Sequence, residues 1–167
     1  MVILDCHEFD AIGKDAEGNR ERFLAFWRQL SAHCATAGDD VVFELLNEPS
    51  RKLTPALWNE YLREALALVR EKNPLRTVIV GPAFWNSIDH LDELVLPAAD
   101  RHLIITVHYY KPMEFTHQGA AWSSHKDKAG VDWQGSAAEL KAMRDDFAKV
   151  VTWAETNRRP IFLGEFG

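Results

Sequence analysis

Two glutamates stand where apolar segments end, and together they could form a catalytic pair. Glu48 follows the apolar run 41–46, and Glu165 follows the run 161–163. Glycoside hydrolysis requires two facing carboxyl groups: one protonates the leaving oxygen, and the other attacks the anomeric carbon or activates water. Because the transition state resembles an oxocarbenium ion, an ionised carboxylate beneath it also stabilises the developing charge. We therefore expect these two side chains to face each other across a sugar-sized gap.

Polar and aromatic side chains follow the other apolar runs as well. The exits of the runs carry His7, Asn47, Glu48, Trp85, Asn86, His108, Tyr110 and Glu165. Any one of these residues could simply be a solvated loop residue. A sheet covered by helices has no structural need for the whole set at its strand ends, so the set predicts a binding or catalytic site.

Composition and missing motifs exclude several other classes of protein. The net charge is −6, from 19 basic and 25 acidic residues, so no basic surface is available to bind nucleic acid. No run approaches the roughly 20 apolar residues of a membrane span. Cys6 and Cys34 form neither a disulfide framework nor a zinc motif. Glycine-rich phosphate and dinucleotide loops and the Gly-x-Ser-x-Gly elbow are also missing. We expect no metal and no organic cofactor.

The candidate residues must be positioned by a sheet, because short apolar runs alternate with amphipathic segments. Strands are predicted at 2–4, 41–46, 77–80, 103–107 and 161–163, and helices at 20–37, at 54–73, at the less regular 90–96 and after Ser136. Near-continuous apolar strands alternating with helices indicate a parallel α/β sheet covered on both sides. Two architectures fit: an open doubly wound sheet, or part of a (βα)8 barrel, whose full form takes about 250 residues.

Local signals predict several helix ends. Thr54 and Pro55 are typical of an N-cap and the first helical position, Gly38 is expected to end the helix 20–37, and Ser136 with Glu139 forms a capping box. A long loop is expected at 109–135. Three acids before the first predicted helix, Asp10, Asp15 and Glu17, are interpreted as solvated loop charges.

Both ends of the chain have the character of strand interiors. Met1 is followed directly by an apolar run without the basic region of a signal peptide, and the last run stops at Gly167. Domains seldom begin and end in buried strands, so we expect residues 1–167 to be a single partial domain from a larger protein.

A resemblance to a known family enters with the segment Phe43-Glu44-Leu45-Leu46-Asn47-Glu48-Pro49. This segment resembles the Asn-Glu-Pro signature of glycoside hydrolase family 5, the cellulase family of the retaining (βα)8 clan. The second glutamate at the end of 161–165 and the segments 5–7, 108–110 and 115–120 match the family's pattern in the same order. The resemblance implies a partial (βα)8 barrel with five parallel strands, the third to the seventh. Strands one, two and eight are then absent, and with them an arginine and a tryptophan of the family's site.

The resemblance also implies a role for each matching residue. Glu48 resembles the general acid/base and Glu165 the nucleophile of a double displacement with retention. Asn47 resembles the residue that binds the sugar 2-hydroxyl, and His7 resembles a histidine of the substrate-binding floor. The pair His108 and Tyr110 resembles the sixth-strand pair, in which Tyr110 hydrogen-bonds the nucleophile and His108 lines the site near the acid/base. The two carboxyl groups should then lie about 5–5.5 Å apart.

The positions of other side chains near the predicted site indicate their roles. Glu44 should point into the barrel beneath the acid/base, and because an unpaired buried carboxylate is costly we expect it to have a partner in a structural network. Trp85 and Trp122 are candidate platforms for sugar rings, whereas Trp133 fits loop packing equally well. His117 and Gln118 are expected to line the cleft or to order the loop, and the tryptophans within predicted helices are expected to pack.

The function expected on these grounds is hydrolysis of a β-1,4-glucan, with mannan, xyloglucan and β-1,3-glucan left open. One alternative is a non-catalytic carbohydrate-binding pseudo-enzyme, and another is an unrelated doubly wound enzyme. The expected partner is a polysaccharide or oligosaccharide. The isolated chain is expected to be weakly active or inactive and to self-associate through exposed sheet edges. Its parent is expected to be secreted or periplasmic.

Overall fold

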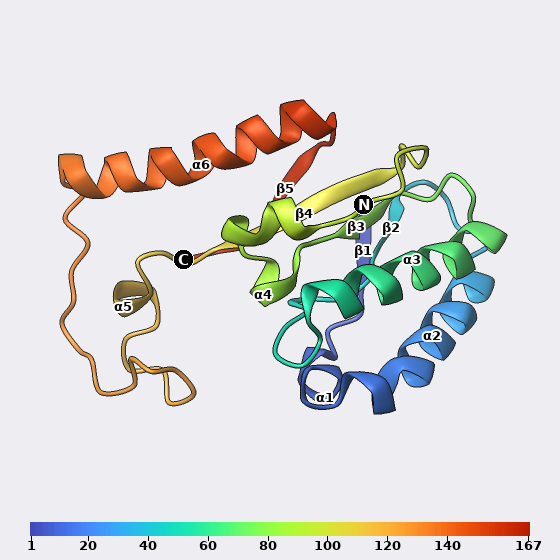
Figure 1. Ribbon diagram of the computed structural model, residues 1–167, viewed down its shortest axis with the longest axis horizontal. Helices are drawn as coiled ribbons and strands as arrows, with labels where there is room; N and C mark the ends of the chain where they lie inside the picture. Colours follow the sequence, from blue (N-terminus) through green and yellow to red (C-terminus); the bar gives the residue numbers. More distant parts are fainter.

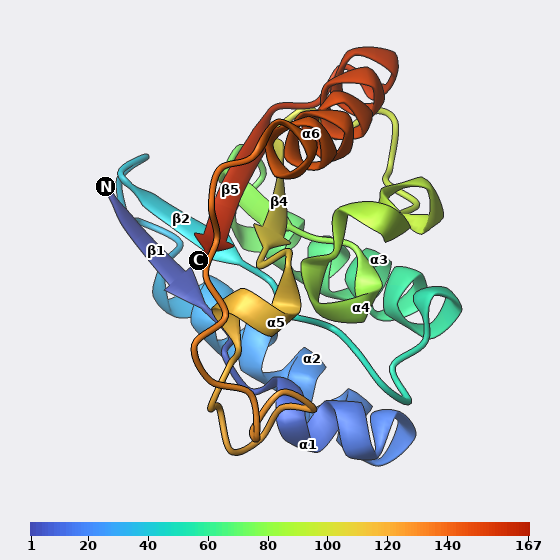
Figure 2. The same ribbon diagram turned by 90° about the vertical axis from the view of Figure 1, so that its left-hand side faces the viewer.

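The computed structural model describes residues 1–167 and contains one five-stranded parallel sheet. Its strands are β1 (Val2–Asp5), β2 (Val41–Glu44), β3 (Val78–Val80), β4 (Leu103–Tyr109) and β5 (Ile161–Phe166). They lie in the sheet in chain order, every neighbouring pair is parallel, and the sheet curls (Figure 2). A doubly wound sheet would reverse its strand order at a switch point. The sheet is therefore part of a (βα)8 barrel, as predicted, and the doubly wound alternative is wrong.

The connections between strands carry the helices. These are α1 (Phe9–Lys14), α2 (Ala16–His33), α3 (Pro55–Lys72), α4 (Ala83–Asn86), the 3-10 helix η1 (Ile88–Glu93), α5 (Met113–Thr116) and α6 (Ala137–Asn157). Helices α2 and α3 pack side by side on the outside of the sheet. Helix α6 lies beside β5, the strand at one edge of the sheet (Figure 1). No helix of the chain is long and apolar enough to cross a membrane.

Several predicted helix ends are confirmed by the hydrogen bonds of the caps. The Thr54 hydroxyl accepts a hydrogen bond from the Leu57 N–H, and Pro55 occupies the first turn of α3. The reciprocal bonds between Ser136 and Glu139 are both present at the start of α6. Because these signals depend on neighbours within four positions, they are visible in the sequence.

The beginning of α2 was predicted incorrectly. The helix starts at Ala16 rather than Arg20, because the Asp15 carboxylate accepts a hydrogen bond from the Gly18 N–H and caps it. Asp15 is therefore a capping residue and not a free loop charge. Asp10 lies in the unpredicted helix α1, where it forms ion pairs with Lys14 and Arg51. The helix ends at its C-cap Cys34, so Gly38 lies beyond it.

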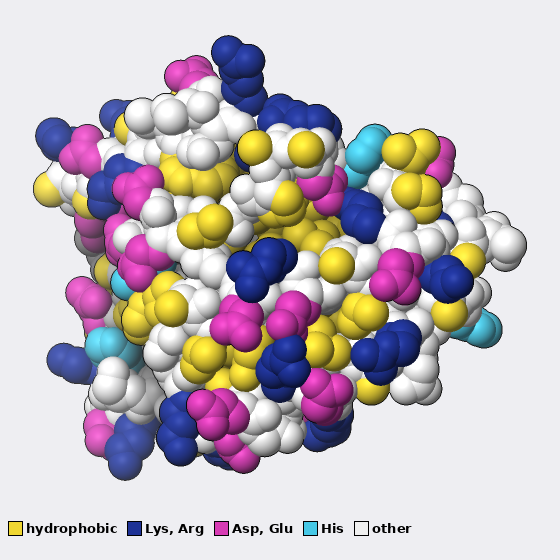
Figure 3. Space-filling model, turned by 45° about the vertical axis from the view of Figure 1, so that its right-hand side comes forward, with side chains coloured by type: hydrophobic (Ala, Val, Ile, Leu, Met, Phe, Trp, Pro, Cys, Tyr) yellow, Lys and Arg dark blue, Asp and Glu magenta, His cyan; other side chains and the backbone are white.

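Alternate strand residues face two different environments. Phe43, Val78 and Ile105 are buried in the main core with the helices, where Trp27 and Trp58 are also almost completely buried. The alternating residues Val42, Glu44 and Ile79 are buried outside that cluster, on the concave face of the sheet. Charged side chains of both signs alternate with apolar patches over the face of the molecule shown in Figure 3.

Strands β4 and β5 extend beyond the predicted runs and carry site residues in their last positions. A register shift between Val107 and His108 pairs His108 with Glu165. Gly164 makes the close approach of the two strands possible, because a Cβ atom there would lie 2.4 Å from Thr106 Oγ1. The geometry of the two strands therefore aligns a histidine with a carboxylate at the same end of the sheet.

Candidate active site

Glu48 lies just beyond β2, in a turn with unusual backbone geometry. Its φ of 49° is in the left-handed region, which residues other than glycine rarely adopt. Strand-like hydrogen bonds lead up to it: the Leu45 N–H donates to the Ile79 carbonyl, and the Asn47 N–H donates to the Cys6 carbonyl. The Glu48 side chain is 17% exposed. Backbone strain of this kind is frequent at functional sites, where surrounding contacts hold it in place.

His108 links the two candidate catalytic carboxylates. Its Nδ1 atom lies 2.9 Å from Glu48 Oε1 and 3.5 Å from Glu165 Oε2. One atom from each of these three side chains lies within 4.8 Å of the other two. Two acids that are far apart in the sequence therefore meet at the carboxyl ends of their strands.

The separation of two catalytic carboxyl groups is related to the reaction that they can perform. Carboxyl groups about 5–5.5 Å apart leave room for attack on a sugar, whereas about 6.5–9.5 Å is needed to place a water between acid and base. One oxygen of Glu48 and one of Glu165 lie within 4.8 Å of each other, so the two carboxyl groups are near enough to act on the same sugar. The same three side chains are close enough to hold a metal ion, although the contacts of His108 with both carboxylates account for the arrangement.

Tyr110 is a second residue, besides His108, that contacts Glu165. Its hydroxyl donates a hydrogen bond of 2.9 Å to Glu165 Oε2. Burial raises the pKa of Tyr110 to about 12, and the negative charges of Glu165 and Glu48 add to that effect. The hydroxyl therefore keeps its proton at any ordinary pH and acts as a donor to the carboxylate.

A second hydrogen-bonded chain leads to Asn47. The His7 Nδ1 atom lies 2.7 Å from Asp5 Oδ2, and the Asn47 side-chain amide lies 3.3 Å from His7 Nε2. Asn47 is almost fully buried, whereas the His7 side chain is 60% exposed. The contact with His7 fixes the side-chain amide of Asn47, the residue before Glu48. His7 itself faces the solvent. Asp5 was not predicted as a member of this group.

The loop after β4 adds aromatic side chains beside Tyr110. The His117 ring packs edge-on against Tyr110 at 5.0 Å and against Trp122 at 4.9 Å between ring centroids. Gln118 orders the loop through hydrogen bonds with Phe115 and Val131. Trp122 is 78% exposed at the outer end of this aromatic row. Gln118 therefore orders the loop, one of the two roles predicted for this pair, and His117 contacts Tyr110.

The other two candidate tryptophans have different surroundings. Trp85 is 43% exposed, and its backbone N–H donates to the Pro49 carbonyl, directly after Glu48 in the chain. Trp133 instead lines a cavity between the loop and α6, together with Phe115 and Met143. Trp133 therefore packs away from the carboxylate pair.

Asn86 is a site residue for which the sequence provides no role. It is completely buried, and its Nδ2 atom lies 3.3 Å from His108 Nε2. Its position after an apolar run was visible in the sequence. Its orientation was not, because the turn that contains it has a left-handed backbone that no sequence pattern predicts.

The prediction of a partner for Glu44 is wrong. This carboxyl is 8% exposed and forms no hydrogen bond or ion pair with another residue of the chain. Burial raises the pKa of Glu44 to about 7, and the negative charges of Asp5 and Glu165 contribute to the increase. The physical reason is that its neighbours on the concave face include acids as well as histidines, so no single cation compensates it.

Comparisons with known proteins identify the family. The family model for cellulase (glycosyl hydrolase family 5) matches residues 1–167. Endoglucanase H of Acetivibrio thermocellus is 33% identical over 167 residues, which is 99% of this chain and 17% of that protein. Cellodextrinase A of Ruminococcus flavefaciens is 27% identical and covers 92% of this chain and 46% of that protein.

Solved structures agree with this result. Endoglucanase Cel5A of Thermotoga maritima superimposes with a TM-score of 0.94 at 40% identity, covering 99% of this chain and 54% of that one. The cellulose synthase subunit Z of Clostridioides difficile gives a TM-score of 0.95 at 38% identity, with coverages of 99% and 55%. The chain thus spans about half the length of these structures. Since the family model spans the whole sequence, the chain belongs to the cellulase family, glycosyl hydrolase family 5.

Proposed function

We propose that this chain carries the catalytic half of a retaining β-glycanase that acts on a β-1,4-glucan. The observation that carries the proposal is the approach of Glu48 and Glu165 to within 4.8 Å through their oxygens, with His108 between them. The names of the relatives, several of which are endoglucanases, support a β-glucan as substrate. We further propose that residues 1–167 are part of one catalytic domain and that its parent is secreted or periplasmic.

In the first chemical step Glu165 attacks the anomeric carbon while Glu48 protonates the leaving glycosidic oxygen. The products are a glycosyl-enzyme ester on Glu165 and a free sugar hydroxyl. The Tyr110 hydroxyl stabilises the ionised Glu165 before attack, because hydrogen bonds to a carboxylate favour its charged form. Glu165 is therefore held in the charged form that a nucleophile needs.

In the second step Glu48, now ionised, removes a proton from water, and the resulting hydroxide cleaves the ester. Two inversions at the anomeric carbon give net retention. Forming the ester removes the charge of Glu165, so the later ionisation of Glu48 is not opposed by a neighbouring carboxylate. No cofactor is needed for this cycle.

The remaining site residues fit substrate binding. Asn47 is placed to hydrogen-bond the sugar 2-hydroxyl, and His7 is exposed enough to contact the sugar beneath. Trp85 and Trp122 present partly or largely exposed indoles, which can stack on the apolar faces of sugar rings.

The decisive experiment measures hydrolysis of an aryl β-cellobioside and the configuration of the first product. We expect the β-anomer first, and a loss of about a hundredfold or more in kcat for Glu165→Ala and for Glu48→Ala. Azide should rescue Glu165→Ala with an α-glycosyl azide and Glu48→Ala with a β-glycosyl azide, because it replaces a different group in each. Glu60→Ala, at an exposed position of α3, is the matched control. Turnover that persists in Glu165→Ala, or an α-anomer as first product, would refute the assignments.

A non-catalytic carbohydrate-binding role is the second candidate. The observation that favours it is the exposure of the Trp85 and Trp122 indoles, which can stack on sugar rings whether or not a bond is cleaved. The test compares this chain with the same chain extended by the flanking sequence of its source gene. Binding of cellotetraose without turnover in both proteins would support the second candidate, whereas turnover in the extended protein would exclude it.

The choice of polysaccharide is a separate question. Thermotoga maritima Cel5A has been solved in complex with mannotriose as well as with cellobiose, so one relative binds both sugars. Comparing kcat/KM on glucan and mannan oligosaccharides would decide between an endoglucanase and a mannanase.

A further inference from the structure

The turn after β3 has a backbone that L-amino acids disfavour. Phe84, Trp85 and Asn86 are three consecutive residues with φ values of 57°, 62° and 54°. Left-handed residues other than glycine normally occur singly, because the Cβ atom crowds the following carbonyl. Backbone strain of this kind persists only where the surrounding structure compensates for it, and it concentrates at functional sites.

The turn is held in place at both ends and delivers one side chain to the site. The Trp85 N–H donates to the Pro49 carbonyl, and Ser87 pairs with His108 in an isolated bridge. Between these contacts the side chain of Asn86 is completely buried. Gly81 leaves the space for it, since a Cβ atom there would lie 2.2 Å from Asn86 Oδ1.

The contact between Asn86 and His108 determines which ring nitrogen carries the proton. Asn86 Nδ2 lies 3.3 Å from His108 Nε2, and an amide nitrogen can only donate. Nε2 must therefore accept, which places the proton of the neutral ring on Nδ1. Nδ1 is the atom that faces Glu48 at 2.9 Å and Glu165 at 3.5 Å.

We propose that Asn86 is a positioning residue that holds His108 in the Nδ1–H tautomer. The N–H then donates to Glu48 Oε1 and faces Glu165 Oε2 at 3.5 Å, so it favours the ionised forms of both groups, which for Glu48 is the form that acts in the second step. With the proton on Nε2, a nitrogen lone pair would face the two groups and would repel them when they are ionised. The tautomer follows from this contact with the amide oriented as the structure has it, whereas its consequence for catalysis depends on the function proposed above.

If the side-chain amide of Asn86 had the opposite orientation, the opposite tautomer of His108 would be expected. Asn86 Oδ1 is buried without a hydrogen-bond partner. If the amide were turned over, Oδ1 would lie at Nε2 and would require a proton there, in the other tautomer or in the imidazolium. The position of this proton is therefore the quantity to measure.

The first experiment is long-range proton–nitrogen NMR of the histidine rings at neutral pH. It uses the 15N-labelled chain, with the His108 signals assigned by their loss in His108→Gln. We expect a protonated Nδ1 and an unprotonated Nε2. A proton on Nε2 in the unsubstituted chain would overturn the proposal, whether or not the protein hydrolyses any sugar.

Two substitutions test the cause, and both are compatible with the left-handed backbone. Asn86→Gly removes the amide, so we expect the proton to redistribute towards Nε2. Asn86→Asp keeps the shape but can only accept, so we expect Nε2 to become protonated. Phe84→Gly is the matched control, because Phe84 shares the turn but stacks on His90 and does not contact His108. Unchanged His108 signals in both Asn86 variants would contradict the proposal.

The kinetic experiment uses whichever form of the protein hydrolyses aryl β-cellobioside. Asn86→Gly and Asn86→Asp should lower kcat about tenfold and leave KM within about twofold, because the substrate contacts stay while the ionised carboxylates lose the N–H that faces them. Phe84→Gly should leave both constants unchanged. A change confined to KM would contradict a positioning role. If no form is active, the proposed function fails while the tautomer assignment is still decided by NMR.

Discussion

Acidic side chains on the concave face of the sheet dominate the electrostatics at the residue scale. Burial raises the pKa of Asp5 as well as that of Glu44. Asp5 has His7 as a partner, whereas Glu44 has none. The folded state therefore holds a proton on Glu44 that the unfolded chain has already lost near neutral pH.

This difference predicts how stability depends on pH. Because the pKa of Glu44 rises from 4.5 to about 7 on folding, the free energy of unfolding should fall as pH rises between these values and level off above pH 7. The full effect is about 3 kcal/mol. Glu44→Gln should remove it and stabilise the protein at pH 7.5 but not at pH 4. Urea denaturation across this pH range is the measurement. The exposed Glu60→Gln is the control, and an equal gain there would contradict the argument.

The two adjacent tyrosines provide a test of the nucleophile's environment. Tyr110 donates to Glu165, whereas the Tyr109 hydroxyl lies 3.4 Å from Asp146, away from the site. A hydrogen bond to a charged group contributes about 1.5–3 kcal/mol. Without it a smaller fraction of Glu165 is ionised and its carboxylate is less well oriented for attack, so Tyr110→Phe should lower kcat on an aryl β-cellobioside by roughly tenfold to a hundredfold. Tyr109→Phe should leave kcat unchanged, and similar losses in both variants would show that the effect is structural.

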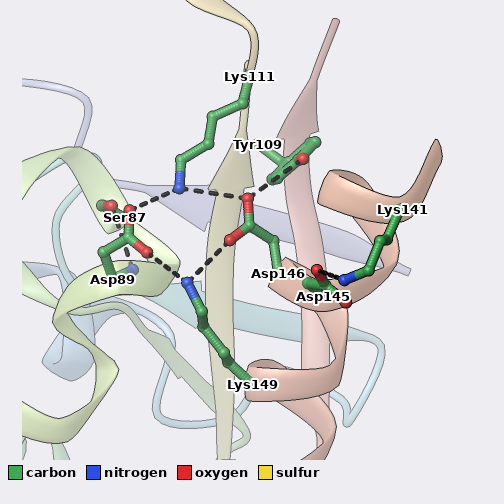
Figure 4. Close-up of polar contacts among 8 residues, drawn as sticks. All are labelled: Ser87, Asp89, Tyr109, Lys111, Lys141, Asp145, Asp146 and Lys149. Carbon is green, nitrogen blue, oxygen red and sulfur yellow. Dashed lines mark hydrogen bonds and ion pairs between the residues drawn. The ribbon is translucent and has the colours of Figure 1, made fainter. Parts of the chain in front are cut away.

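At the scale of elements, an ion network attaches α6 to the rest of the molecule. Figure 4 shows Asp146 of α6 between Lys111, which follows β4, and Lys149 of α6, with Asp89 of η1 contacting both lysines. Hydrogen bonds from Lys111 and Lys149 lower the pKa of Asp89. Because the charges alternate and Asp146 is only 13% exposed, this network should contribute more than isolated surface pairs do.

Substitutions of two neighbouring aspartates compare the network with an ordinary surface ion pair. Asp146→Asn should lower the free energy of unfolding by about 1 kcal/mol, and the loss should diminish at high salt. Asp145→Asn, whose partner Lys141 is exposed, should change it by less than about 0.5 kcal/mol. Thermal denaturation at low and high ionic strength checks both values. Equal effects of the two substitutions would show that the network adds nothing to a simple pair.

At the scale of the whole molecule, the curled sheet has two edges. Strands β1 and β5 each pair on one side only, and they carry the exposed apolar residues Val2 and Phe166. Unpaired edges with apolar side chains favour pairing with other chains. The isolated chain should therefore associate as its concentration rises.

Sedimentation velocity over a range of concentrations tests this expectation. The double variant Val2→Lys with Phe166→Lys should sediment as a monomer at concentrations where the original chain associates, because charged edges resist pairing. Val151→Lys is the control, since Val151 is 55% exposed and belongs to α6 and not to either edge strand. If the control abolishes association equally, the edges are not the contact.

Much of this fold could be predicted from the sequence because its signals are local. Alternation of apolar runs with helical periodicity placed all five strands, and the caps at Thr54 and Ser136 depend on residues one turn away. An aspartate that caps a helix looks the same in a sequence as an aspartate in a loop, so the start of α2 after Asp15 is not predicted. The two glutamates were recognisable because each follows an apolar run.

The contacts between distant segments were decided only by the tertiary structure. The register that pairs His108 with Glu165, the left-handed turn that brings Asn86 to His108, and the unpaired burial of Glu44 all depend on strands far apart in the chain. Residue types at strand ends determine which chemistry is available. Which side chains meet, and which ring nitrogen faces an acid, depends on curvature, register and packing, to which every element contributes at once.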